Sequence, residues 1–222
     1  MHIVSYPTPL MRFNTCSTHR VYPWRARNDF RLWMQIICCP ALIEQNVTLN
    51  DQSTIHLRPG KTRDFEMLWT MLSTLSEDSL RFLHNRFNRD EIETWMKNID
   101  YDSLLPIVAV VKDQATGKTR IAALTTLGFQ KGESRKHRAE FDIIVHDDYQ
   151  GKGLGKVLTR YMLDIALEKG LKKVYLKTDT CNQRAKHVYE KLGFMVEGRL
   201  VMEHYHYLTQ QYGDDYRMAI IL

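Results

Sequence analysis

The sequence predicts a mixed α/β domain, and three features of the 222-residue chain indicate it. Short runs with strand-like alternation recur along the chain, and segments with apolar residues at helical spacing separate them. A glycine-rich turn joins one strand-like run, residues 139–145, to a helical pattern with apolar residues from Val157 onward. The chain has no internal repeat, so a solenoid is not expected. With 44% apolar residues it can bury one substantial core.

The first half of the predicted domain contains a strand, helices and a hairpin. In chain order, the expected elements are a strand at 54–57, two or three helices between 62 and 99, and hairpin strands at 106–112 and 120–127. Arg58-Pro59-Gly60 is expected to end the first strand. Ser76 precedes two acidic residues and is expected to cap one of the helices.

The second half alternates strands and helices before it ends in two strands. The expected elements are a strand at 139–145, a helix ending at Lys169-Gly170, a strand at 173–177, a helix from Asn182 to Gly193, and strands at 194–206 and 216–222. Asn182 suits the first position of its helix because its side chain can accept a hydrogen bond from a free backbone N–H. Glycines directly after the two helices suit their ends.

A change in composition near Asn50 divides the chain into an extension, residues 1–50, and a main domain, residues 51–222. The first fifty residues hold five arginines, no lysine and two acids, and so carry +3 of the net charge of +5. We interpret them as a poorly ordered or peripheral segment. Because the remaining 172 residues are nearly balanced in charge, nucleic-acid binding has little support.

Cysteine usage and hydropathy favour a cytoplasmic protein with reduced thiols. Cys38 and Cys39 are adjacent, Cys181 is isolated, and the chain has no Cys-x-x-Cys motif. The apolar run at 32–43 is too short to span a bilayer and contains Pro40. We therefore expect no membrane segment and no secretion.

The glycine turn between residues 147 and 156 is the first candidate for a binding site. Glycines allow close approach of a ligand, and the free N–H groups at a helix start suit a phosphate. A P-loop needs four residues between its first glycine and the Gly-Lys-Ser/Thr group, but only three separate Gly151 from Gly155, and Val157 replaces the hydroxyl residue. The Gly-x-Gly-x-x-Gly dinucleotide motif has a different period and a different place in the fold.

The remaining pattern, Gln150-x-x-Gly153-x-Gly155, resembles the acetyl-CoA signature of the GNAT superfamily of N-acetyltransferases. A second segment, which runs from Asn182 through Tyr189 to Phe194, is similar to a later helix and strand of that family. The resemblance implies a central, mostly antiparallel sheet with a parallel pair at the acetyl-CoA site, flanked by helices. The alternative is a structural strand–helix turn that binds no ligand.

The resemblance also implies which residues bind acetyl-CoA. The pyrophosphate would lie on the turn amides, and the pantetheine would pair with the backbone of the preceding strand. The implied set is Ile143, Ile144, Val145, Gln150, Gly151, Lys152, Gly153, Leu154, Gly155, Lys156 and Asn182. The side chains of the strand residues are expected to belong to the core, and helix capping alone would also explain Asn182.

Acetyl transfer to an amine needs a neutral nucleophile, whereas a lysine amine has a pKa of ~10.4. Glu140 lies ten residues before Gln150, near the family's catalytic glutamate, and is the first candidate for the base that takes the proton. Asp142 lies two residues further along and shares its face in a regular strand, so it is the second candidate. By resemblance, Tyr189 would protonate the departing thiolate. Alternatively, Glu140 is a solvated carboxylate and Tyr189 is a core residue.

His204 and His206 are the one pattern that suggests a metal. The sequence places no third ligand at a suitable spacing, so we expect strand-face histidines and no metal.

The acceptor is less defined than the cosubstrate. Residues 75–82 and 99–102 resemble the corresponding region of Pat-type protein lysine acetyltransferases, although the Arg81-Phe82 pair is slightly out of register. This resemblance implies a protein lysine as acceptor, with acyl-CoA synthetases as plausible partners. The alternatives are an acetyltransferase for N-termini or small amines, and a non-catalytic acyl-CoA sensor.

Overall fold

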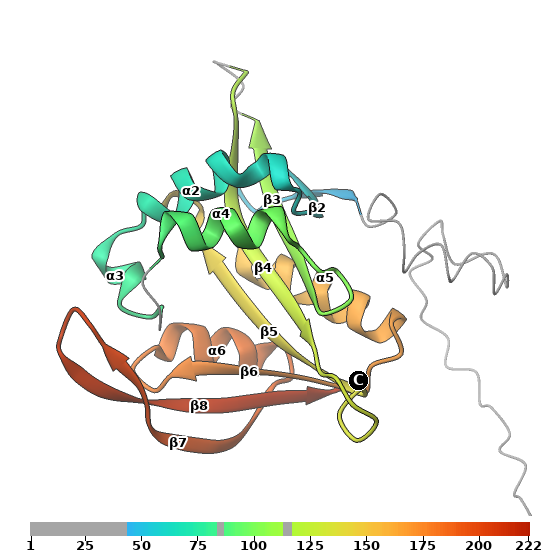
Figure 1. Ribbon diagram of the computed structural model, residues 1–222, viewed down its shortest axis with the longest axis vertical. Helices are drawn as coiled ribbons and strands as arrows, with labels where there is room; N and C mark the ends of the chain where they lie inside the picture. The colour runs from blue at the N-terminus through green and yellow to red at the C-terminus, as the bar shows by residue number, and fades with distance from the viewer. Residues whose placement is uncertain (1–43, 84–86, 113–116) are drawn as a thin grey trace, which may run out of the picture. The chain divides into compact units, whose positions relative to one another are not determined.

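The computed structural model describes residues 44–83, 87–112 and 117–222, and it contains an eight-stranded sheet with helices on both faces (Figure 1). The strand order is β1-β2-β3-β4-β5-β6-β8-β7. Within the described sheet, β5 and β6 are parallel and the other neighbours are antiparallel. The predicted mixed α/β fold, with a mostly antiparallel sheet and one parallel pair, is therefore confirmed.

The strands follow the predicted order closely. They are β1 (Gln45–Thr48), β2 (Thr54–Pro59), β3 (Leu104–Lys112), β4 (Thr119–Phe129), β5 (Arg138–Val145), β6 (Lys173–Asp179), β7 (Met195–His206) and β8 (Gln211–Ile221). The predicted hairpin is the β3–β4 pair, and β7 pairs with β8.

The described helices are α2 (Phe65–Ser73), α3 (Glu77–Leu80), α4 (Arg89–Lys97), α5 (Leu154–Glu168) and α6 (Gln183–Lys191), with short 3₁₀ turns η2 (Thr62–Asp64) and η3 (Asp147–Tyr149). Two of the helices, α3 and α6, begin directly after the predicted caps Ser76 and Asn182. Ser76, Asn88 and Asn182 each accept a hydrogen bond from a backbone N–H of the first turn. No helix in the described ranges is long and apolar enough to cross a membrane.

Two apolar clusters cover the two faces of the sheet. The larger cluster packs α5 against alternate residues of β5, among them Ala139 and Phe141, and Tyr189 of α6 packs against it. The smaller cluster packs α2 and α4 against Val108, Ile121 and neighbouring residues of β3 and β4. In β5, the residues between the core positions, Glu140 and Asp142, therefore point to the α2–α4 face.

The parallel pair β5–β6 is short. It comprises three residue pairs, Arg138–Lys173, Ala139–Val174 and Glu140–Tyr175, whereas β4–β5 and β6–β8 each comprise seven. Beyond Glu140 the two strands diverge, as Figure 1 shows. The sheet consequently opens between residues 141–145 of β5 and the end of β6.

Three boundaries differ from the sequence prediction. β1 and the buried Leu49 precede the predicted domain start at residue 51, so the sheet includes part of the predicted extension, and residues 1–43 lie outside the described residues. β2 continues through Arg58 and Pro59, which pair with Val108 and Ile107 of β3. The Arg58 guanidinium forms a buried two-bonded ion pair with Asp64, at 2.6 and 2.7 Å. β8 begins at Gln211 rather than at residue 216.

Candidate active site

The opening between β5 and β6 is the candidate site, and the glycine turn lies directly after β5. η3 and the turn connect β5 to α5, whose first residue, Leu154, is buried in the core at 1% exposure. Gly151 and Gly153 have φ angles of +77° and +89°, in the left-handed region that favours glycine. The amides of the first turn of α5 have no partner within the helix, which suits an anion there.

Of the predicted cosubstrate residues, those between 143 and 156 lie at this end of β5 and in the turn after it, whereas Asn182 caps the start of α6. Ile143 and Val145 pack partly against the larger core cluster and Ile144 against the smaller one, so they can bind a ligand only through their backbone. Leu154 is likewise limited to its amide, because its side chain is buried. Gly151 and Lys156 are exposed.

The side chain of Gln150 forms hydrogen bonds with other protein groups. Its amide nitrogen donates to the Val145 carbonyl (3.0 Å) and to the Ser79 hydroxyl (2.9 Å), and its oxygen accepts from Arg184 of α6 (3.0 Å). The side chain thus connects the end of β5, α3 and α6. A role in positioning the turn follows from these contacts.

Asp147 connects the turn to α3 in the same way. Its Oδ1 accepts from the hydroxyls of Ser76 (2.8 Å) and Ser79 (2.6 Å), and its Oδ2 accepts from the Ser76 amide (2.8 Å). Desolvation would raise the pKa of Asp147, but the bonds from Ser79 and Ser76 outweigh it and hold the pKa below its ordinary value. The contacts of Asp147 with Ser76 and Ser79 were not predicted, although the acidic pair at 147–148 in the turn was a visible signal.

The segment after β1 supports the other side of the turn. The Asn50 amide donates to the Lys152 carbonyl (3.5 Å), and Lys152 Nζ lies 3.3 Å from a carboxylate oxygen of Asp51. A Cβ on Gly153 would lie 3.1 Å from the side-chain nitrogen of Asn50. Glycine is therefore favoured at this position by the close approach of Asn50 as well as by the positive φ angle.

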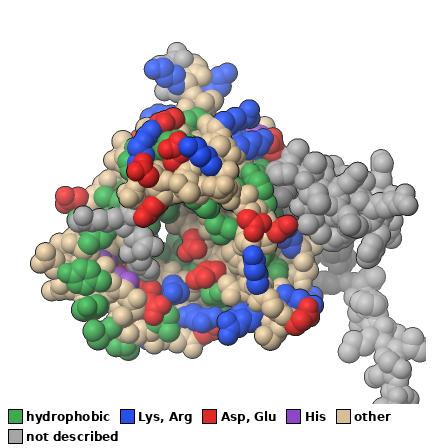
Figure 2. Space-filling model, viewed as in Figure 1, with side chains coloured by type: hydrophobic (Ala, Val, Ile, Leu, Met, Phe, Trp, Pro, Cys, Tyr) green, Lys and Arg blue, Asp and Glu red, His purple; other side chains and the backbone are tan. Residues whose placement is uncertain are grey.

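The two candidate bases lie on one face of β5 in different surroundings. The Tyr175 hydroxyl donates to Glu140 Oε2 at 3.3 Å, at the last residue pair before the strands diverge. Asp142 lies beyond that pair, beside the opening. Figure 2 shows acidic side chains in a hollow on this face of the molecule.

Asp142 has the more perturbed environment of the two carboxylates. Its side chain reaches solvent, yet surrounding protein atoms displace much of its hydration. This desolvation, together with the negative charge of Glu140, raises the pKa of Asp142 to about 6, while Lys177 acts in the opposite direction. A carboxyl with such a pKa can accept a proton near neutral pH.

Tyr189 lies on α6 with its ring against the core. The ring makes an edge contact with Phe141 (6.4 Å between centroids) and a tilted contact with Phe194 (5.8 Å). Desolvation and the charge of Asp142 raise the pKa of Tyr189. Its hydroxyl therefore keeps its proton at neutral pH.

Asn182 has a clear structural role. Its side-chain oxygen accepts from the Ala185 amide at 3.0 Å and so caps α6. This contact accounts for the residue without a ligand.

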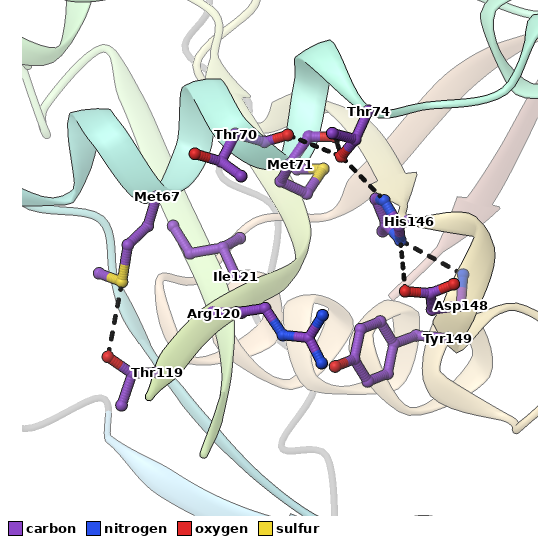
Figure 3. Close-up of a pocket in the computed structure, with 10 residues that line it drawn as sticks. All are labelled: Met67, Thr70, Met71, Thr74, Thr119, Arg120, Ile121, His146, Asp148 and Tyr149. Atoms are coloured by element: carbon purple, nitrogen blue, oxygen red, sulfur yellow. Dashed lines mark hydrogen bonds and ion pairs between the residues drawn. The ribbon is translucent and has the colours of Figure 1, made fainter. Parts of the chain in front are cut away.

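A pocket of about 340 Å³ lies beside the turn but does not coincide with the opening (Figure 3). It is formed by α2, the start of β4 and η3, and it contains none of the predicted site residues. On one side of it, His146 Nε2 lies 3.1 Å from the Thr74 hydroxyl, as Figure 3 shows. This contact holds α2 against η3, and the pocket is separate from the acid pair on β5.

Comparison with known proteins agrees with the geometry. Residues 69–194 match the model of the acetyltransferase (GNAT) family. The chain is 30% identical over 166 residues to a spermidine N(1)-acetyltransferase of Vibrio cholerae, covering 68% of this chain and 91% of that protein. It is 43% identical over 84 residues to the spermidine N(1)-acetyltransferase of Escherichia coli K12, covering 37% of this chain and 44% of that enzyme, which is less than half its length.

Solved structures show the same fold. The GNAT domain of Streptomyces lividans PAT has a TM-score of 0.67 at 19% identity, over 83% of this chain and 99% of that one. The Vibrio cholerae spermidine N-acetyltransferase in complex with CoA and spermine has a TM-score of 0.61 at 26% identity, over 75% of this chain and 95% of that one. The match of residues 69–194 to the family model and the 30% identity to the Vibrio cholerae enzyme show that the chain belongs to the acetyltransferase (GNAT) family.

Proposed function

We propose that the protein is an acetyl-CoA-dependent N-acetyltransferase whose acceptor is a small, positively charged amine. The single observation that carries this proposal is the opening between β5 and β6, which has the glycine turn at one end and the Glu140–Asp142 pair on one face. The first feature suits an acyl-CoA, and the second suits a cationic acceptor.

Three features support acetyl-CoA as cosubstrate. Main-chain groups of residues 143–145 border the opening, where an extended amide chain can add to the sheet edge. The turn after them has two left-handed glycines and the free amides of a helix start. In addition, a relative with 26% identity has been solved with CoA.

The acceptor is inferred from charge and from the relatives. Two carboxylates in a partly desolvated hollow attract an amine that carries further positive charges. Spermidine N(1)-acetyltransferases are among the relatives, and one solved relative holds spermine. We therefore favour a polyamine-type acceptor over the protein lysine that the sequence analysis put first.

The chemistry follows from the two perturbed groups. Asp142 takes a proton from the ammonium group, directly or through water, and the neutral nitrogen attacks the thioester carbonyl carbon. A C–N bond forms and the C–S bond breaks. The Tyr189 hydroxyl supplies a proton to the departing thiolate, which leaves as CoA. Glu140 acts on this step through the pKa of Asp142.

The test measures CoA release and product mass with a panel of acceptors. Full-length protein and acetyl-CoA would be incubated with spermidine, spermine, putrescine, Nα-acetyl-lysine or a protein extract. We expect monoacetylated polyamine as the main product and much slower turnover of the lysine derivative.

The other outcomes are equally informative. Acetylated internal lysines in the extract without polyamine turnover would restore the protein-lysine interpretation. Acetylated N-termini would indicate the second alternative. Bound CoA with no product from any acceptor would leave a non-catalytic acyl-CoA-binding protein.

A further inference from the structure

Asp179, His204 and His206 form a compact cluster that has no part in the chemistry proposed above. Asp179 ends β6, and the two histidines lie near the end of β7. The two Nε2 atoms are 2.8 Å apart, and Asp179 Oδ2 lies 2.7 Å from His206 Nε2 and 3.3 Å from His204 Nε2. Among the described residues, these three form the one group with geometry suited to a metal ion.

The spacing of the three atoms fits one bound ion. Zinc binds imidazole nitrogen and carboxylate oxygen at about 2.1 Å, which puts neighbouring ligands of a tetrahedral site roughly 3.4 Å apart and those of an octahedral site roughly 3.0 Å apart. The separations of 2.7 to 3.3 Å are of this size. Two imidazoles and one carboxylate also form a donor set that first-row transition metals accept.

Hydrogen bonds among the three side chains explain their close approach less well than a bound metal cation does. Each neutral imidazole nitrogen holds either one proton or one lone pair, and both Nε2 atoms approach the same oxygen. Protonating both rings would place two N–H groups, each on a positive ring, 2.8 Å apart. Asp179 and Asp215 are 4% and 0% exposed, and a divalent ion would balance their two negative charges.

Surrounding groups hold two of the ligands in orientation. Asp179 Oδ1 accepts from the Cys181 amide at 2.6 Å, which directs Oδ2 toward the histidines. His204 Nδ1 lies 3.2 Å from Asp215 Oδ1, so the buried carboxylate can fix the ring with Nε2 facing the cluster. Carboxylates behind a ligating histidine are a common feature of metal sites.

The backbone is also shaped around His204. The β7–β8 pairing shifts register between Leu200 and His204, and Met202 within the bulge has a φ of +52°. Opposite the ring lies Gly213, where an added Cβ would come within 2.3 Å of His204 Nε2. The absence of a side chain at Gly213 therefore allows the ring to reach the cluster.

We propose that Asp179, His204 and His206 bind one divalent first-row transition metal ion, with Zn²⁺ the best fit. The three residues leave coordination positions for water. The ion fastens the end of β6 to β7 and so stabilises the β6–β8–β7 part of the sheet. Binding of the ion does not require the proposed acetyl transfer.

The test uses untagged, full-length protein that has been treated with a chelator and dialysed. Co²⁺ is titrated as a spectroscopic probe, Zn²⁺ is added in competition, and metal content is measured by mass spectrometry. We expect one ion per chain, visible Co²⁺ absorption that Zn²⁺ displaces, and a higher melting temperature with Zn²⁺ but not with Mg²⁺. No stoichiometric Co²⁺ or Zn²⁺ binding by the folded wild type would overturn the proposal.

Variants locate the bound ion. His204→Gln, Asp179→Asn and Gly213→Ala are expected to weaken Co²⁺ affinity more than about 10-fold. His137→Gln, which changes an exposed histidine elsewhere, should bind like the wild type. Circular dichroism checks folding, and the wild-type titration decides the matter if a ligand variant does not fold. Unchanged affinity in folded ligand variants would also refute the assignment.

Discussion

Glu140 and Asp142 are successive residues on the same face of β5, but they differ in their distance from the point where β5 and β6 separate. This difference gives the two carboxylates different surroundings. Glu140 accepts a hydrogen bond from Tyr175 where β5 and β6 are still paired. Asp142 lies where the strands have parted, and its pKa is raised to about 6. The residue that the sequence ranks second is therefore the better candidate for the base.

Exchanging each carboxylate for its amide separates the two roles. We expect Asp142→Asn to lower kcat by ~10²- to 10⁴-fold, because a positioned base contributes about that much. Glu140→Gln should lower kcat far less. Steady-state kinetics of both variants with the same amine provide the measurement, and the reverse order of effects would return the role to Glu140.

The same pair predicts a pH dependence. Because Asp142 must be deprotonated to act, kcat at saturating substrates should fall about tenfold per pH unit below about pH 6. The charge of Glu140 is one cause of the raised pKa, so Glu140→Gln should move the break in the profile to lower pH. A profile of kcat against pH for both proteins checks this, and an unmoved break would contradict the coupling.

Individual residues were predictable from sequence when their role is local. Ser76 and Asn182 cap the helices that follow them, as the sequence predicts. By contrast, the third member of the histidine cluster, Asp179, lies 25 residues before His204, and only the pairing of β6, β8 and β7 brings the residues together. Spacing along the chain carries no signal for such a contact.

Two glycines of the turn, Gly153 and Gly155, should respond differently to substitution by alanine. Gly153→Ala should destabilise the protein by roughly 1–2 kcal/mol, because a side chain at φ +89° is strained. It would also crowd Asn50. Urea unfolding measures the loss of stability.

Gly155→Ala is the matched comparison. Its Cβ would have no atom within 4 Å beyond its chain neighbours and the backbone of its own helix, so the free energy of unfolding should change little or rise. A higher KM for acetyl-CoA in this variant would then report contact with the ligand. An unchanged KM would place the cosubstrate away from Gly155.

The first turn of the helical region is anchored by the Arg58–Asp64 pair, which the sequence prediction of a break at Arg58 overlooked. Asp64 is 0% exposed and its carboxylate also accepts from the Lys61 amide (2.8 Å). Its hydrogen bond to Arg58, less the cost of burial, raises the pKa of the guanidinium. A charged residue in an apolar strand pattern therefore signals a buried partner nearby.

Removing one member of that pair should be costly. Asp64→Asn leaves the Arg58 charge buried without its counterpart, so we expect a loss of about 3 kcal/mol in the free energy of unfolding. Glu93→Gln, which breaks the exposed Lys97–Glu93 pair, should leave stability nearly unchanged. Equal effects of the two substitutions in urea unfolding would show that the burial of Arg58–Asp64 contributes nothing.

At the scale of the whole domain, the order of elements was predictable, because each carries its own period of apolar residues. The N-terminal edge was not: β1 is four residues long and alternates between half-exposed and exposed positions, so it lacks an apolar signal. Its place is set by backbone pairing with β2 and by Leu49. The β5–β6 opening was likewise implied only by family resemblance.

Two truncated chains would measure how much β1 and the residues after it contribute to stability. A chain that begins at residue 44 should melt at a higher temperature than one that begins at residue 53, because the second lacks β1, Leu49 and the contacts of Asn50 and Asp51 with Lys152. The shorter chain should also show a higher KM for acetyl-CoA, since the turn loses a support. Equal melting temperatures would mean that β1 is dispensable.

The short β5–β6 ladder divides the sheet into two blocks of strands, β1 to β5 and β6 to β8, with three residue pairs between them. A cosubstrate lying in the opening would supply hydrogen bonds to β5 in place of the missing β5–β6 pairing, and these bonds would be lost when it leaves. Deuterium uptake by the amides of residues 141–145 should then slow when CoA is added. The two blocks of strands would then be held together more firmly while the cosubstrate is bound and less firmly after CoA leaves. The flexibility of the sheet would therefore change in each round of acyl transfer.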